Sequence, residues 1–213
     1  MRSMPGLSLA ELLVDGSPSA VRGHVDAALD DGLDARDLCV ELITPALYEV
    51  GRLWQTGQIT IAQEHLASAI AQVEIARLAP RMRREPPVRR LAILAATAGE
   101  LHTVGLSMLR ELLEADGWLA LYLGQSTPAQ DLTALVAERR PDVVGLSTAL
   151  TTHLTAARET FEALRGLPNR PWLLAGGYAY GGDEALARSL GADEFVPDAV
   201  TAADRLRSRF ARA

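Results

Sequence analysis

The sequence predicts an α/β protein in which an N-terminal helical bundle cap precedes a flavodoxin-like (Rossmann-like) domain with a five-stranded parallel sheet. Three observations support this fold class. Apolar residues recur at helical spacing up to residue 82, a proline-containing segment then interrupts the pattern, and five short apolar runs alternate with amphipathic stretches from residue 90 onward. Such alternation is typical of a parallel sheet covered by helices.

The first part of the chain carries the helical periodicity, and no strand pattern intervenes. The apolar residues at helical intervals include Leu9, Leu12 and Leu13, then Val21, Val25 and Leu29, then Leu38, Leu42 and Leu47. Pro86 and Pro87 end the pattern, because proline lacks an amide donor and restricts the residue before it. We therefore expect a helical cap at residues 1–82, a linker at 83–89 and the α/β domain at 90–213.

The second part contains the apolar runs that we expect to form strands. Parallel strands joined by right-handed crossovers place their carboxyl ends at one edge of the sheet, and ligands bind beyond that edge. The predicted strands are Leu91–Ala96, Trp118–Leu123, Val143–Leu146, Trp172–Ala175 and Glu194–Val196.

Composition and charge exclude several classes of protein. A hydrophobic content of 48% in 213 residues is enough for a buried core, and a net charge of -6 argues against a nucleic-acid-binding surface. The single cysteine, Cys39, has no partner for an internal disulfide and is expected to be a buried apolar residue. Glu11 and Asp15 interrupt the first apolar stretch, so we expect neither an export signal nor a membrane span, and a cytoplasmic location.

Three short segments at the predicted strand ends carry the chemistry. They are Glu100-Leu101-His102-Thr103-Val104-Gly105, then after 41 residues Ser147-Thr148-Ala149, then after 26 residues Gly176-Gly177. Glu100 and His102 lie two positions apart in a loop, so the carboxylate can accept one ring N–H and leave the other ring nitrogen for a metal. Small hydroxyl residues and glycines line a narrow slot. Taken singly, each segment also fits an ordinary loop or tight turn.

The order and spacing of these segments resemble the cobalamin-binding domain pattern D-x-H-x-x-G, S-x-L and G-G, with Glu100 in place of aspartate and Ala149 in place of leucine. The resemblance implies that cobalamin binds with its dimethylbenzimidazole displaced and His102 as the lower axial ligand of cobalt, the base-off/His-on mode. His153, a few residues after the third predicted strand, either approaches the edge of the corrin or its nucleotide tail, or belongs to a helix cap near Thr151-Thr152. The resemblance also implies cofactor-binding roles for Glu100, Thr103, Val104, Gly105, Ser147, Thr148, Gly176, Gly177 and Tyr178.

A second pattern lies in the helical part, where nine residues separate Trp54 from Glu64-His65. Gly57 can end one helix in a left-handed conformation, and Thr60 with Gln63 forms a capping box that begins the next. We therefore expect Trp54 and Glu64 on the two helices of a hairpin. For each residue alone, a core anchor and a first-turn acid are the simpler interpretations.

The W-x9-E-H spacing resembles that of CarH-type adenosylcobalamin-dependent photoreceptors. In that family the tryptophan covers the adenosyl group, and the glutamate and histidine frame the same cavity, which implies these roles for Trp54, Glu64 and His65. The family also has a histidine directly after the tryptophan, which becomes the upper ligand in light, and this chain has Gln55 there. Either water or His65 then takes the upper position after illumination.

The resemblance implies a regulatory protein rather than an enzyme. It predicts a light-sensing module that holds adenosylcobalamin and responds to photolysis of the Co–C bond. The chain departs from the family in a second way: only a few residues precede the first predicted helix, so we expect no DNA-binding domain in the module itself. The expected response is a change in contacts with a regulatory protein partner or in assembly, including a light-dependent homo-oligomer, with no direct binding of nucleic acid or membrane. The alternative is a corrinoid methyl-carrier that uses methylcobalamin and serves a methyltransferase. Trp54 with Glu64 favours the light sensor.

Overall fold

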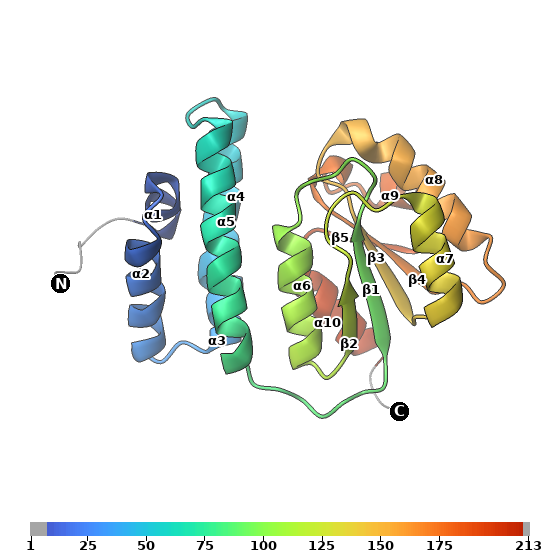
Figure 1. The fold of residues 1–213 in the computed structure, drawn as a ribbon, viewed down its shortest axis with the longest axis horizontal. Helices are drawn as coiled ribbons and strands as arrows, with labels where there is room; N and C mark the ends of the chain where they lie inside the picture. Colours follow the sequence, from blue (N-terminus) through green and yellow to red (C-terminus); the bar gives the residue numbers. More distant parts are fainter. Residues whose placement is uncertain (1–7, 211–213) are drawn as a thin grey trace. The chain divides into compact units, whose positions relative to one another are not determined.

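The computed structural model describes residues 8–210, and residues 1–7 and 211–213 of the predicted domains lie outside this range. The chain divides between Arg83 and Arg84 into two compact units, a helical unit and a sheet unit, which are described separately (Figure 1). Within the described residues, none of the helices combines the length and the apolarity needed to cross a membrane.

The described part of the helical unit contains helices and no strand, as predicted. Its elements are α1 (Leu9–Asp15), α2 (Pro18–Asp30), α3 (Ala35–Asp37), the π-helical segment η1 (Leu38–Ile43), α4 (Thr44–Gln55), α5 (Ile61–Leu78) and the 3-10 turn η2 (Ala79–Arg81). The apolar positions of the helical pattern form its core, whose most buried side chains include Leu13, Val21, Val25, Leu38, Ile43, Val50, Ile75 and Leu78.

The π-helical segment has a local cause. Pro45 has no N–H to donate and its ring disfavours a regular helical turn before it. The N–H of Thr44 reaches back five residues to the carbonyl of Cys39, and the Thr44 hydroxyl donates to the same oxygen at 2.8 Å. Cys39 itself is fully buried, which confirms the prediction, and burial raises the pKa of its thiol to about 12.

The described part of the sheet unit holds one parallel sheet with the strand order β2-β1-β3-β4-β5. This is the flavodoxin-like order. Each predicted run is confirmed as a strand, with differences of a residue or two at the ends. The strands are β1 (Leu91–Ala96), β2 (Leu119–Tyr122), β3 (Val143–Ser147), β4 (Trp172–Gly176) and β5 (Glu194–Val196).

Helices cover both faces of the sheet. The helices of this unit are α6 (Val104–Ala115), α7 (Ala129–Arg139), α8 (Leu154–Arg165), α9 (Glu184–Ser189) and α10 (Ala199–Arg209). Helices α6 and α10 pack together on one face, and α7 and α8 lie on the other (Figure 1). Successive strand residues point to opposite faces, and Ile93 and Ala95 of β1 share a buried cluster with Phe161 of α8. Burial on both faces explains why the strands read as continuous apolar runs.

Candidate functional site

The carboxyl edge of the sheet brings the three motif segments together. In the parallel register, Ala96 of β1 lies beside Ser147 of β3, and Ser147 lies beside Gly176 of β4. The loops that follow β1, β3 and β4 therefore leave the sheet side by side, where ligands bind in this class of fold. The prediction that the motifs lie at neighbouring strand ends is confirmed.

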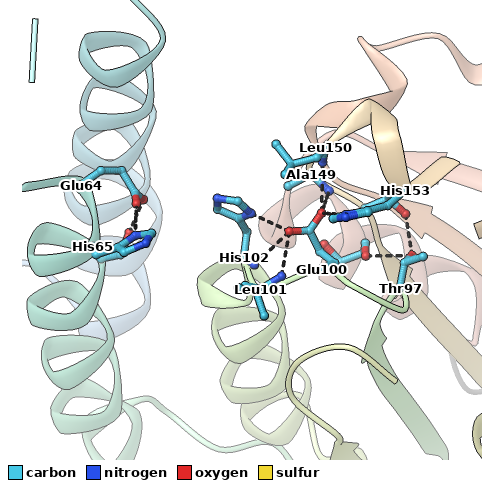
Figure 2. Close-up of polar contacts among 12 residues, drawn as sticks. Glu64, His65, Thr97, Glu100, Leu101, His102, Ala149, Leu150 and His153 are labelled. Atoms are coloured by element: carbon cyan, nitrogen blue, oxygen red, sulfur yellow. Dashed lines mark hydrogen bonds and ion pairs between the residues drawn. The ribbon is translucent and has the colours of Figure 1, made fainter. Parts of the chain in front are cut away.

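The loop after β1 holds His102 against Glu100. The Glu100 side chain is fully buried, and its Oε1 lies 2.5 Å from Nδ1 of His102. The same oxygen accepts the backbone N–H groups of Leu101 and His102, each at 3.0 Å (Figure 2). The contact that the two-residue spacing predicts is therefore present.

Hydrogen bonds keep the buried carboxyl of Glu100 ionised. Burial raises its pKa, but hydrogen bonds from His102, His153 and the Leu150 backbone outweigh burial, so the pKa lies well below its ordinary value. An ionised carboxylate only accepts hydrogen bonds, so His102 carries a proton on Nδ1, and Nε2 is the ring nitrogen that can coordinate a metal. The His102 side chain is 36% exposed, so a ligand can reach it.

Glu100 also connects this loop to the loop after β3. Its Oε2 accepts the backbone N–H groups of Ala149 at 2.8 Å and Leu150 at 3.0 Å, and the ring N–H of His153 from Nδ1 at 3.1 Å. Figure 2 shows His102 and His153 on opposite sides of the carboxylate. Sequence reasoning missed this contact, and its only signal was the position of His153 shortly after a strand. His153 is also the N-cap residue of α8, but its side chain makes no capping hydrogen bond to that helix and contacts Glu100 instead.

Thr148 and Gly177 lie where the loops after β3 and β4 contact each other. Gly177 has a φ of 106°, and a Cβ there would lie 2.3 Å from the Thr148 carbonyl oxygen, so only glycine fits. The Thr148 N–H donates to the Gly176 carbonyl at 2.9 Å. The buried Thr148 hydroxyl lies 2.8 Å from that of Thr97 and 3.3 Å from that of Tyr180. Thr148 is thus a link between loops, and its predicted contact with a ligand stays a prediction.

The remaining predicted residues surround the same edge. Thr103 is buried at the N-cap of α6, and Val104 begins that helix. A Cβ added to Gly105 would meet no atom within 4 Å, and the Tyr178 side chain is 65% exposed. Ser147 is half-buried at the end of β3. The space at Gly105 and the exposed Tyr178 leave room for a ligand, and the binding roles of all these residues stay predictions.

The helical unit contains the predicted hairpin. Trp54 is half-buried in the last turn of α4, and Gly57 after it has a left-handed φ of 71°. The side chains of Thr60 and Gln63 form the expected capping box at the start of α5. Trp54 therefore lies near one side of the turn between the two helices and Glu64 near the other.

A second carboxylate–imidazole pair lies in the first turns of α5. Nδ1 of His65 is 2.6 Å from the Glu64 carboxylate, which also accepts the Ser68 hydroxyl at 2.8 Å (Figure 2). The His65 side chain is 64% exposed, so its ring is open to a ligand. The roles of Trp54, Glu64 and His65 toward a cofactor stay predictions.

Comparison with known proteins identifies the family. A B12 binding domain model matches residues 90–207, and a second B12 binding domain model matches residues 8–78. The chain belongs to the B12-binding domain family. The predicted cobalamin-binding superfamily is thereby confirmed.

Relatives of this B12-binding protein include a repressor and corrinoid proteins. The HTH-type transcriptional repressor CarH of Myxococcus xanthus is 35% identical over 157 residues, which are 73% of this chain and 52% of CarH, so the chain spans about half of that relative. A corrinoid protein of Desulfitobacterium hafniense is 25% identical over 207 residues, 93% of this chain and 95% of that protein.

A solved structure supports the fold of this B12-binding protein. The Methanosarcina barkeri monomethylamine corrinoid protein matches with a TM-score of 0.81 over 94% of this chain and 96% of its own, at 18% identity. The donor chemistry of the site also fits cobalamin. A corrin ring surrounds cobalt with its own nitrogen donors, so the protein needs to offer only an axial ligand, and a neutral imidazole held by a carboxylate is suited to that position.

Proposed function

We propose that this B12-binding protein is a light-responsive regulatory module that holds adenosylcobalamin base-off, with Nε2 of His102 as the lower ligand of cobalt. The observation that carries the proposal is the buried Glu100 carboxylate, which fixes the Nδ1–H tautomer of His102. This tautomer presents a basic Nε2 lone pair at the carboxyl edge of the sheet. The other residues of that edge that contact the cofactor are Thr103, Val104, Gly105, Ser147, Thr148, Gly176, Gly177 and Tyr178.

Residues of the helical unit serve the upper face of the corrin. Trp54 covers the adenosyl group, and Glu64 orients the ring of His65 by accepting its Nδ1–H. The similarity to CarH supports this assignment, because the match covers 157 residues, more than the sheet unit contains, and so includes part of the helical unit.

The response to light follows from contacts that depend on the adenosyl group. Bound adenosylcobalamin supplies a Co–C bond that light breaks. Trp54 contacts the adenosyl group only while that group is attached, so its loss changes which arrangement of the helical unit is most stable. Gln55 offers no imidazole, so water or His65 occupies the upper position afterwards. The output is a change in assembly or in contacts with a protein partner.

A corrinoid methyl-carrier is the second candidate function. The observation that favours it is the match to the Desulfitobacterium hafniense corrinoid protein, which covers 93% of this chain and 95% of that protein. The match therefore extends over nearly the whole of both sequences. In this function the chain binds methylcobalamin and serves a methyltransferase.

Binding of two cobalamins separates the candidates. The purified chain is titrated with adenosylcobalamin and with methylcobalamin in darkness, and absorption and molar mass by light scattering are then recorded before and after green light. We expect tighter binding of the adenosyl form and a light-dependent change in both signals. Preference for the methyl form, or a spectrum and mass that do not respond to light, would overturn the light-sensing proposal.

A matched pair of variants tests the role of Trp54. Trp54→Ala is expected to abolish the preference for the adenosyl form, whereas Leu53→Ala, at the neighbouring half-buried position of the same helix, is expected to keep it. Equal effects of the two substitutions would refute a specific contact between Trp54 and the adenosyl group.

A further inference from the structure

The loop after β1 begins with a tight turn that leads directly to Glu100 and His102. The Glu100 N–H donates to the Thr97 carbonyl at 2.9 Å, and Gly99 has a φ of 86°. A hydrogen bond between the first and fourth residues, with a left-handed third residue, is typical of a type II turn. Such a turn makes no use of the N–H of its third residue, so the Gly99 N–H is available to an acceptor from elsewhere.

Ser126, in the loop after β2, supplies that acceptor. The Gly99 N–H donates to the Ser126 hydroxyl oxygen at 2.9 Å, and the Ser126 N–H donates to the Glu100 carbonyl at 2.9 Å. A single residue of the neighbouring loop therefore holds the backbone of both Gly99 and Glu100.

Ser126 makes these contacts in a backbone conformation that serine seldom adopts. Its φ is 45°, in the left-handed region that favours glycine. Such strain persists where surrounding contacts fix the chain, and it is concentrated at functional sites. The contacts here are with Ala96 at the end of β1, whose N–H donates to the Gly124 carbonyl at 3.2 Å and whose carbonyl accepts the Thr127 N–H at 3.0 Å. The loop after β2 is thus a fixed support for the turn.

We propose that Ser126 is a positioning residue that sets the place of His102 relative to the cofactor, by holding the backbone of Gly99 and Glu100 from the loop after β2. The inference rests on the proposed role of His102 as the lower ligand. A ligating side chain has to lie within about 0.5 Å of its productive position, and His102 follows the turn by two residues. Without the Ser126 hydroxyl the turn can shift, and cobalamin binding then has to restore its position.

Three substitutions at this exposed position separate the hydrogen bond from the backbone strain. Ser126→Ala removes the acceptor and keeps the strain, and Ser126→Gly removes both. Ser126→Asn keeps a side-chain oxygen in a residue that tolerates a left-handed φ. Each variant is titrated with adenosylcobalamin in darkness. We expect Ser126→Ala and Ser126→Gly to bind about fivefold more weakly, the effect of one neutral hydrogen bond, and Ser126→Asn to stay within about twofold of the native protein.

Stability and affinity should follow different orders, which distinguishes positioning from a purely structural role. Urea denaturation of the ligand-free variants should show Ser126→Gly to be more stable than Ser126→Ala, because glycine adopts the left-handed conformation without strain. Affinities that follow this order of stability would overturn the inference, and so would native affinity in both variants. Binding by Ser126→Asn as weak as that of Ser126→Ala would contradict the role of the acceptor.

Ser189→Ala in α9 is the matched control. It also removes a serine hydroxyl with one hydrogen bond, which the native side chain donates to the Leu186 carbonyl at 2.7 Å. This variant should keep the native affinity for adenosylcobalamin. A loss equal to that of Ser126→Ala would show that the effect is not specific to the turn and would overturn the inference.

A double-mutant cycle shows whether Ser126 acts through the lower ligand. In a His102→Ala background, Ser126→Ala should cause no further loss of affinity, because the residue that it positions is absent. The same loss in both backgrounds would contradict an effect through His102. Failure of the proposed function gives a different result: His102→Ala alone then leaves the affinity for adenosylcobalamin unchanged.

Discussion

Gly105 provides a test in which one added methyl group is expected to have opposite effects on folding and on cofactor binding. Gly105 is the second residue of α6, and an added Cβ would meet no atom within 4 Å. Alanine is favoured over glycine in a helix by up to about 1 kcal/mol. Because Gly105 lies in the first turn, we expect Gly105→Ala to raise the free energy of unfolding of the ligand-free protein by about 0.5 kcal/mol.

The same methyl group is expected to hinder cobalamin. If the space beside Gly105 holds part of the cofactor, the overlap costs about 1 to 3 kcal/mol, which weakens binding by about tenfold or more. Urea denaturation measures the first effect, and an absorption titration with adenosylcobalamin measures the second. Gly23→Ala in α2 is the control, since its Cβ also meets no atom within 4 Å, and it should change stability alone. Native affinity in Gly105→Ala would refute the proposed position of the cofactor.

Three further substitutions probe contacts within the two units. Gly177→Ala should lower the free energy of unfolding by about 2 kcal/mol or more, because its Cβ would lie 2.3 Å from the Thr148 carbonyl oxygen, and an unchanged urea midpoint would contradict this. The pKa of Glu100 is lowered on folding, so its contacts stabilise the protein above the ordinary value of 4.5 and this stability is lost as the pH falls toward the lower folded value. The free energy of unfolding of Glu100→Gln should therefore fall less steeply than that of the native protein between about pH 6 and pH 3. If denaturation curves give the same dependence of this free energy on pH for both proteins, the result would count against an ionised Glu100. Arg77→Met should lower the free energy of unfolding by about 2 kcal/mol, because the buried Glu74 loses one of its two arginine partners. A decrease in the melting temperature of less than about 1 °C would refute this.

The sheet was predictable because its strands are buried on both faces. The run Leu91–Ala96 was expected from its apolar residues alone and is β1. Strand order did not follow from the same pattern, because alternating strands and helices fit more than one wrap. The π-helical segment Leu38–Ile43 was also missed. Its apolar periodicity resembles that of an ordinary helix. The wider turn depends on Pro45, which has no N–H, and on the N–H of Thr44, which reaches back five residues to the carbonyl of Cys39.

Local contacts of the site were more predictable than contacts between loops. The contact between Glu100 and His102 follows from a spacing of two residues in one loop. The contact between Glu100 and His153 joins residues 53 positions apart and depends on the path of the loop after β3. Thr148 shows the same limit, because the contacts of its hydroxyl with those of Thr97 and Tyr180 join residues 51 and 32 positions apart.

The central claim is that Nε2 of His102 is the lower ligand of cobalt. Electron paramagnetic resonance of Co(II) cobalamin bound to protein labelled with nitrogen-15 tests it directly, because an axial nitrogen-15 splits each cobalt line into a pair and an axial nitrogen-14 splits it into a triplet. We predict pairs with the labelled protein, and loss of the pairs in labelled His102→Ala. Triplets from the labelled native protein would show that the benzimidazole of the cofactor remains on cobalt and would contradict ligation by His102.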